Sequence, residues 1–282
     1  MTQTLRQAIA DHKPLIAPSI YDGISALVAK EFGFPAVYIG SYATGATKYG
    51  LPDIGYLGVE DMADQVRRLA PLVGVPVIVD GEGGFGNPLH VAEAIKRLER
   101  AGADGVHIED HEFGKHITSR PAVLPIAKAV DKIKAALDAR SSSEMLVIAR
   151  TDAAMPLGAD EALARAVAFQ EAGADAVFLA GYGFRDTSDW DAVRRNIHVP
   201  VFNTDMPGLS AAECAALGVG VVLYYGLSHF VAQQAVRSAF QTLAETGSAV
   251  SLNLPPQNVL DFDAFLGIGQ AREDAQRYGL ID

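Results

Sequence analysis

Residues 170–181 read QEAGADAVFLAG, and residues 99–110 read ERAGADGVHIED. In each stretch a helix-like segment runs into a glycine, and a short apolar segment follows the glycine. KEFGFPAVYIG at 30–40 and AALGVGVVLYYG at 215–226 repeat this unit. Many helices end at a residue in the left-handed conformation. This conformation costs a residue with a Cβ atom about 1–2 kcal/mol, whereas glycine adopts it without that cost. The repeated unit therefore predicts helices that lead into buried parallel strands.

Eight apolar segments are predicted as strands, and amphipathic helical segments separate them. The strands are expected at 15–18, 36–39, 76–80, 105–108, 145–149, 176–179, 201–203 and 221–225. The helical segments include 59–70, 89–101, 124–139 and 159–172. This alternation predicts a parallel sheet, and eight units in about 250 residues match a closed (β/α)8 TIM-type barrel. An open, doubly wound sheet is the alternative fold.

No Gly/Ser-rich linker or charge block divides residues 1–282, so we expect a single barrel domain. Extra helices are expected after the eighth strand, at 227–246 and about 260–277, joined by the polar segment SLNLPPQN. These C-terminal helices, within about 227–282, need a surface on which to pack.

The chain has 34 Asp and Glu residues against 23 Lys and Arg residues, which gives a formal net charge of −11. Nucleic acids and anionic membranes bind basic surfaces, so this charge argues against both as partners. An anionic small-molecule substrate must then be held by local positive charge.

Other features of the sequence indicate a soluble protein of a reducing compartment. The single cysteine, Cys214, cannot form an intramolecular disulfide. The first residues lack the apolar core of a signal peptide, and no apolar run approaches the roughly 20 residues that cross a bilayer. We therefore expect a cytoplasmic location.

Acidic side chains follow the predicted strands, at the end of a barrel where active sites form. They are Asp80 and Glu82 after the third strand, Glu109 and Asp110 after the fourth, Asp152 beside Arg150 after the fifth, and Asp53 after the second. Carboxylates brought together repel one another unless a cation neutralises them, and hard oxygen ligands favour Mg2+, with Mn2+ as the alternative. Any one of these acids could instead cap a helix or bind loop amides.

Gly81, Gly83 and Gly86 also spell GxGxxG between a strand and a helix, the fingerprint of dinucleotide binding. However, Asp80 and Glu82 would face the pyrophosphate that the following helix is meant to attract. The motif is therefore weak, although a nucleotide-binding or non-catalytic barrel remains an alternative.

The loop DHEFGKHITSR at 110–120 carries His111 and His116 on either side of Lys115. Such a loop could close over a substrate, exclude water and supply a proton. An ordinary solvated loop is the alternative. His107 lies within a predicted strand, where a packing role is expected.

Six segments carry a resemblance over almost the whole chain: YDGISALVAKEFGFPAVYIGS, GLPDIGYL, VDGEGGFGN, GVHIED, IARTDA and AGADAVF. Together they resemble the isocitrate lyase / phosphoenolpyruvate mutase superfamily, including its 2-methylisocitrate lyases. The resemblance implies a (β/α)8 barrel that binds Mg2+ and makes or breaks bonds next to a 2-oxo acid through a metal-stabilised enolate. It also implies a homotetramer whose C-terminal helices are exchanged between subunits.

The resemblance further implies which residues form the site. The implied metal ligands, direct or through water, are Asp80, Glu82, Glu109 and Asp53. Arg150 matches the arginine that binds the substrate carboxylate, a role that suits its planar fork. Tyr38 and Ser41 fall near the loop that receives the 2-oxo carboxylate, although the segment GSYATGATKYG is one residue longer here. Asn203 is a further substrate-binding candidate.

The expected gating loop departs from the family pattern. Family lyases carry a Lys-Arg-Cys-Gly-His run whose cysteine protonates the departing enolate, and this chain has KHITS at 115–119. The lysine is kept as Lys115 and the cysteine is replaced by Ile117. We therefore expect Lys115, His116 and Arg150 to be the catalytic residues of a carbon–carbon lyase acting on a small 2-hydroxy or 2-oxo carboxylate, decarboxylation included. A phosphonopyruvate-type or acyl 2-oxo acid hydrolase or phosphomutase is the alternative.

Overall fold

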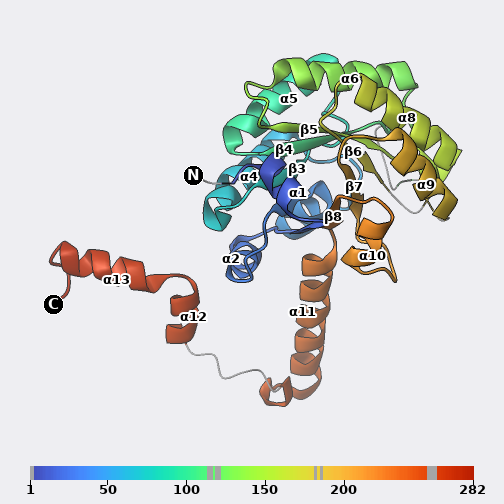
Figure 1. Cartoon of the computed structure of the whole chain (residues 1–282). Coiled ribbons are helices and arrows are strands. Elements are labelled where there is room, and N and C mark those ends of the chain that lie inside the picture. The colour runs from blue at the N-terminus through green and yellow to red at the C-terminus, as the bar shows by residue number, and fades with distance from the viewer. Residues whose placement is uncertain (1–2, 113–116, 118–121, 181–182, 185–186, 253–258) are drawn as a thin grey trace. The chain divides into compact units, whose positions relative to one another are not determined.

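The computed structural model describes residues 3–112, 117, 122–180, 183–184, 187–252 and 259–282. Its centre is one sheet of eight parallel strands in the order β1-β8-β7-β6-β5-β4-β3-β2 (Figure 1). The strands are β1 (Leu15–Pro18), β2 (Val37–Ile39), β3 (Val77–Asp80), β4 (Gly105–Glu109), β5 (Leu146–Thr151), β6 (Ala176–Leu179), β7 (Val201–Thr204) and β8 (Val221–Tyr224). All eight predicted strands are present, and the predicted (β/α)8 barrel is confirmed.

The sheet closes on itself between its first and last members. A parallel bridge joins Ser19 to Tyr38, and the backbone N–H of Ile20 donates a 2.8 Å hydrogen bond to the Tyr38 carbonyl. Because these contacts lie just beyond β1, the carboxyl ends of β1 and β2 are held together at the rim of the barrel.

Helices surround the strands in the order that the sequence predicted (Figure 1). Those of the barrel are α1 (Leu5–Asp11), α2 (Gly23–Glu31), α3 (Ser41–Thr44), α4 (Val59–Val73), α5 (Pro88–Ala101), α6 (Ile126–Ala139), α7 (Ala154–Leu157), α8 (Ala159–Glu171), α9 (Thr187–Asn196) and α10 (Ala211–Ala216). Helix α5 shows how local sequence sets their bounds. The Asn87 side chain caps its start, Pro88 occupies the first turn, and Gly102 ends it with φ +107°.

Two layers of apolar side chains hold the barrel together. One lies between strands and helices; the other lies inside the strands and includes Leu15, Ile148 and Phe178. Helix α1 contributes Leu5 to this inner layer. A Cβ atom on Gly105 would come within 2.6 Å of Leu5 Cδ2, so glycine at that position gives α1 the room it needs.

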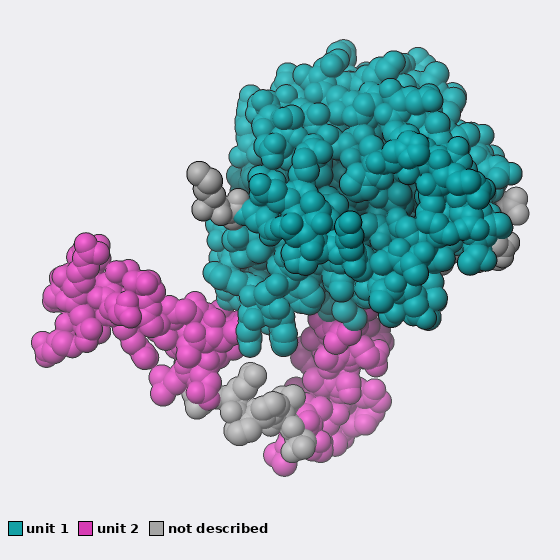
Figure 2. Space-filling model, in the orientation of Figure 1, with its two compact units in different colours: residues 1–229 teal, residues 230–282 magenta. Residues whose placement is uncertain are grey.

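The chain divides into two compact units, residues 1–229 and residues 230–282 (Figure 2). Helix α11 (Leu227–Thr246) matches its prediction. The prediction of a single helix at about 260–277 was wrong, because two helices occupy this segment, α12 (Val259–Phe265) and α13 (Ile268–Arg277). Gly267 separates them with φ +87°, a left-handed conformation that interrupts a right-handed helix.

The second unit has no buried apolar layer among its described residues. Helices α12 and α13 contain no buried residue, and Phe240 on α11 is 68% exposed. That these helices pack on a neighbouring subunit stays a prediction. None of the helices in the described ranges is both long and apolar enough to cross a membrane.

Candidate active site at the carboxyl ends of the strands

The pleat of the strands decides which side chains face the barrel interior. Val106 and Ile108 of β4 belong to the layer beneath the helices. Gly105, His107 and Glu109 alternate with them and therefore face inward. His107, treated from the sequence as a packing residue, thus shares a face with an expected metal ligand.

Neighbouring strands bring the other polar residues to the same level. Asp80 is the register partner of His107, Glu109 is that of Arg150, and Arg150 in turn is that of Phe178. Residues at or next to the ends of three adjacent strands therefore form one polar layer at the barrel mouth.

Asp80 is the best-anchored carboxylate of this layer, and it is 3% exposed. Its Oδ2 accepts hydrogen bonds from Ser41 Oγ (2.8 Å), Ser41 N (3.2 Å) and the Tyr38 hydroxyl (3.3 Å). Its Oδ1 accepts one from Glu82 N (2.8 Å). Ser41 Oγ also lies 3.3 Å from Asp53 Oδ1, which draws the loop carboxylate toward the strand carboxylate. Three other predicted site residues therefore contact Asp80, and Asp53 joins them through Ser41.

The predicted site segment that follows β2 has an unusual local structure. Helix α3 begins at Ser41 and runs into a π-helical turn, Gly45–Tyr49. A π-helical turn closes with one residue more than an α-helical turn. Burial, and next the charge of Asp80, raises the pKa of Tyr38 well above its usual value, so the hydroxyl stays protonated as a donor.

Arg150 is fixed by carboxylates on two sides. Its Nη1 lies 2.7 Å from Glu109 Oε1, while Nε and Nη2 bind the two oxygens of Asp152 at 3.0 and 2.9 Å. The guanidinium also lies 4.9 Å from the ring centre of Phe178. Burial alone lowers the pKa of Arg150, but the charges of Asp152 and Glu109 outweigh burial and raise it. The guanidinium is therefore a permanent, oriented positive charge.

Two histidines complete the polar layer. The ring of His107 stacks on Tyr38, with Nε2 3.1 Å from the Tyr38 hydroxyl and Nδ1 3.6 Å from Asp80 Oδ1. His111 follows β4, and its Nε2 forms an ion-pair contact with Glu109 Oε2. Its Nδ1 lies 2.7 Å from the carbonyl oxygen of Glu112.

These residues form two overlapping groups that fit a divalent cation. One group is Asp80, His107 and Glu109, and the other is Glu82, Glu109 and His111; in each, the possible ligand atoms all lie within 4.8 Å of one another. All members are buried, so bulk water screens their mutual repulsion little. The oxygen-rich donor set suits Mg2+ or Mn2+.

The first glycine of the GxGxxG motif, Gly81, serves close packing in this structure. A Cβ atom on Gly81 would come within 2.6 Å of the His107 carbonyl oxygen, so the loop lies directly against β4. Glu82 takes a left-handed conformation with φ +49°, which is uncommon for a residue other than glycine. Its backbone oxygen accepts a 2.9 Å hydrogen bond from Glu109 N. The loop thus places a carboxylate where a pyrophosphate would have to bind.

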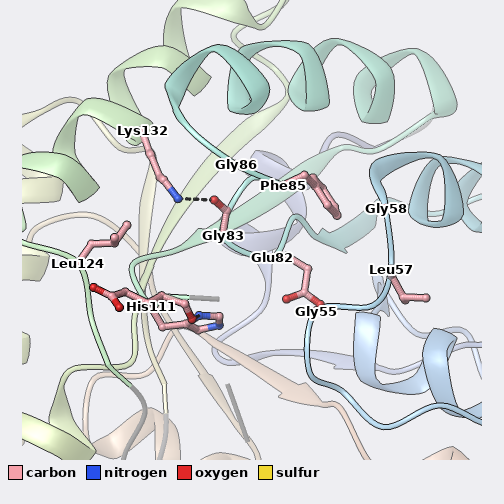
Figure 3. Close-up of a pocket in the computed structure, with 11 residues that line it drawn as sticks. Gly55, Leu57, Gly58, Glu82, Gly83, Phe85, Gly86, His111, Leu124 and Lys132 are labelled. Carbon is pink, nitrogen blue, oxygen red and sulfur yellow. Dashed lines mark hydrogen bonds between the residues drawn. The ribbon is translucent and has the colours of Figure 1, made fainter. Parts of the chain in front are cut away.

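A cavity of about 420 Å³ opens beside the second group (Figure 3). Glu82 and His111 line it, together with the apolar side chains of Leu57, Phe85 and Leu124. Lys132 of α6 also lines the cavity, and its Nζ donates a 2.7 Å hydrogen bond to the Gly83 carbonyl. Burial lowers the pKa of Lys132, and the charge of Glu109 opposes this effect. A small organic acid fits this volume.

The structure leaves the place of two predicted residues open and puts a third on another face of its strand. Lys115 and His116 lie outside the described residues, and neighbouring Ile117 is 65% exposed. Asn203 is buried in β7, but it alternates with Phe202, which belongs to the inner layer. The side-chain oxygen of Asn203 accepts a 3.5 Å hydrogen bond from Thr204 Oγ1. Asn203 therefore lies on the face of β7 opposite to that of Phe202.

Sequence reasoning missed several residues of the site. The two-residue period of β4 was the signal that could have placed His107 with Glu109. Asp152 was noticed as an acidic strand-end residue but not as the partner of Arg150. No pattern in the sequence singled out Lys132, because its contact with Gly83 depends on how α6 packs beside the loop.

Comparisons with known proteins show which sequences this chain resembles. The sequence profile of the family described as phosphoenolpyruvate phosphomutase matches residues 5–244. The 2,3-dimethylmalate lyase of Eubacterium barkeri is 31% identical over 97% of this chain and 96% of its own length. The oxaloacetate decarboxylase of Paraburkholderia xenovorans strain LB400 is 35% identical over 90% of this chain and 85% of its own.

A solved structure extends the comparison to three dimensions. The phosphonopyruvate hydrolase complex with oxalate and Mg2+ superimposes with a TM-score of 0.88 and is 30% identical, covering 99% of each chain. The similar proteins thus include a lyase, a decarboxylase and a hydrolase.

Proposed function

Because the chain belongs to the phosphoenolpyruvate phosphomutase family, within the isocitrate lyase / phosphoenolpyruvate mutase superfamily, we propose that it is a Mg2+-dependent lyase. The bond it cleaves joins two carbons of a small 2-hydroxy or 2-oxo carboxylate, and decarboxylation of a 2-oxo dicarboxylate belongs to the same class. The observation that carries the proposal is the pair of buried carboxylates Asp80 and Glu109 at the barrel mouth, with the half-buried Arg150 beside Glu109.

The residues that would hold the ion are Asp80, Glu82 and Glu109, with Asp53 contributing directly or through water. When bound, the ion stabilises the negative charge that develops on oxygen as the carbon–carbon bond breaks, with Mn2+ as the alternative ion. Ser41 and Tyr38 keep the Asp80 carboxylate oriented by donating to its Oδ2.

Arg150 binds the substrate carboxylate in this proposal. Asp152 holds Nε and Nη2 in plane, so the guanidinium needs no rearrangement when an anion arrives. Tyr38 and Ser41 line the same region, and Asn203 stays a weaker candidate for substrate contact. In this proposal Lys115, with His116, closes over the site and transfers the proton that the reaction requires.

A second candidate function is hydrolysis of an acyl or phosphono 2-oxo acid. Two observations favour it: Ile117 replaces the cysteine of the family lyases, and the similar phosphonopyruvate hydrolase spans the whole chain. In a hydrolase, water attacks the phosphorus or acyl carbon, and the proton that this water gives up can pass to the departing enolate, so the thiol of the family lyases is not required.

One experiment separates the two functions. The metal-stripped enzyme is incubated with a panel of 2-hydroxy and 2-oxo dicarboxylates and phosphonates, with and without Mg2+, and the products are identified by NMR. Two carbon fragments, or CO2 with a 2-oxo acid, support the lyase. Phosphate or a water-derived acid without carbon–carbon cleavage supports the hydrolase and overturns the lyase.

We also propose that the protein is a homotetramer in the cytoplasm. The exposed apolar side chains of residues 230–282 support an assembly in which a neighbouring subunit covers them. The lone Cys214 supports a reducing compartment.

A further inference from the structure

The side chain of His111 is buried and oriented by its own backbone. It is 6% exposed, and its Nδ1 lies 2.7 Å from the carbonyl oxygen of Glu112. A carbonyl oxygen only accepts hydrogen bonds, so Nδ1 must carry a hydrogen and donate. The other ring nitrogen, Nε2, is consequently the one in contact with the Glu109 carboxylate.

The contact between Nε2 and Glu109 requires positive charge. Glu109 turns Oε1 toward Arg150 at 2.7 Å and Oε2 toward His111 Nε2. The lone pair of a neutral imidazole nitrogen and a carboxylate oxygen repel each other at contact distance. Either a proton on Nε2 or a cation shared by both groups must therefore offset the repulsion.

The surroundings favour a shared cation. Glu82, Glu109 and His111 present ligand atoms within 4.8 Å of one another, close enough for one ion. Glu82 and His111 both line the 420 Å³ cavity, so substrate and water have room to complete the coordination. An N–H donated to a backbone carbonyl is also the usual outer contact of a metal-binding histidine.

The second histidine of the cluster is placed differently. His107 is fully buried, its Nε2 contacts the Tyr38 hydroxyl at 3.1 Å, and it is not among the residues that line the cavity. Of the two histidines, His111 is the one that faces space for a ligand.

We propose that His111 is a metal ligand, with Nε2 binding the same divalent ion as Glu82 and Glu109. This inference rests on the proposed metal-dependent function and sharpens it. Mg2+ strongly prefers oxygen ligands, whereas an imidazole nitrogen favours Mn2+ and the later transition metals. The site therefore binds Mn2+ more tightly than Mg2+.

The test is spectroscopic and needs no substrate. Full-length enzyme is stripped with a chelator and loaded with one equivalent of Mn2+, and pulsed EPR records coupling of the ion to nitrogen. The wild-type protein shows 14N coupling, and His111→Gln abolishes it. The same substitution raises the Kd for Mn2+ at least about tenfold and that for Mg2+ much less. His198→Gln, an exposed histidine before β7, is the matched control and changes neither quantity.

The outcomes distinguish this inference from the proposed function. Bound Mn2+ without 14N coupling in the wild-type protein overturns the role of His111 and leaves a metal-dependent lyase standing. Coupling that persists in His111→Gln assigns the nitrogen to another histidine and also overturns it. Failure of the wild-type protein to bind Mn2+ or Mg2+ overturns both proposals. A wild-type spectrum without 14N coupling overturns the inference whether or not a variant folds. Where His111→Gln folds poorly, His111→Asn is the second variant that identifies the coupled histidine.

Discussion

Asp152 binds Arg150 with two parallel hydrogen bonds, one to Nε at 3.0 Å and one to Nη2 at 2.9 Å. On its other side, Arg150 forms an ion pair with Glu109, whose Oε1 lies 2.7 Å from Nη1. Arg150 is therefore held between a carboxylate of the metal cluster and one outside it. The position of the guanidinium, and with it the carboxylate end of the substrate site, depends on this balance.

Replacing Asp152 by Asn is expected to weaken substrate binding more than turnover. The amide keeps the size of the side chain but loses the charge and one acceptor, and a hydrogen bond to a charged group contributes about 1.5–3 kcal/mol. KM should rise roughly ten- to a hundredfold, since each 1.4 kcal/mol is a factor of ten. Steady-state kinetics measure the change. Asp138→Asn, which removes an exposed charge on α6, should leave KM unchanged, and an equal rise there would refute the explanation.

Removing the hydroxyl of Ser41 is expected to loosen the metal site. Ser41→Ala deletes the 2.8 Å hydrogen bond to Asp80 Oδ2 and the 3.3 Å contact with Asp53. Residues that orient ligands typically contribute a factor of about 10–100 to metal affinity. Isothermal titration with Mn2+ should show a Kd raised by that factor. Thr44→Ala, whose hydroxyl binds the Gly40 carbonyl instead, is the control; equal affinities in all three proteins would contradict the role of Ser41.

The contact between α1 and the barrel predicts a loss of stability. Gly105→Ala places a Cβ atom 2.6 Å from Leu5 Cδ2, and such overpacking costs about 1–3 kcal/mol. Urea denaturation should show this decrease in the free energy of unfolding. Gly23→Ala, where the nearest atom is 3.9 Å from the added carbon, should change stability by less than about 1 kcal/mol. A Gly105→Ala protein as stable as the wild type would show that α1 does not press on β4.

The exposed apolar side chains of the C-terminal unit predict a change in assembly. Phe240→Asp puts a charge on a side chain that is 68% exposed in the single chain. If a neighbouring subunit covers this face, the substitution should convert the tetramer into smaller species, because an unpaired buried charge is costly. Light scattering with size-exclusion chromatography measures the mass. Lys134→Asp, on an exposed site of α6, should keep the wild-type mass; a variant at Phe240 that stays tetrameric would place the interface elsewhere.

Much of the fold was predictable because its signals are local. Glycines such as Gly102 and Gly173 end helices in left-handed conformations. The strand after each glycine is apolar on both faces, so it is expected in the buried sheet. The same logic located Asp80 and Glu109 at the barrel mouth. The break at Gly267 escaped prediction because a glycine within a helical pattern is often tolerated.

The missed parts of the site depend on packing between distant segments. The direction of the His111 ring is set by the Glu112 carbonyl and by Glu109, neither of which leaves a pattern in the sequence. Likewise, Lys132 reaches Gly83 across 49 positions of the chain. The roles of Lys115 and His116 stay predictions.

The most direct test of the account follows the carbon–carbon bond itself. Once the panel has supplied a substrate, its 13C-labelled form is incubated with metal-stripped enzyme, with the enzyme restored by Mg2+ or Mn2+, and with Asp80→Asn treated in the same way. The account predicts two labelled fragments only from the restored wild-type enzyme, because Asp80 is the best-anchored carboxylate of the metal cluster. Undiminished cleavage by the stripped enzyme or by Asp80→Asn would contradict the claim that a metal at this site drives the reaction.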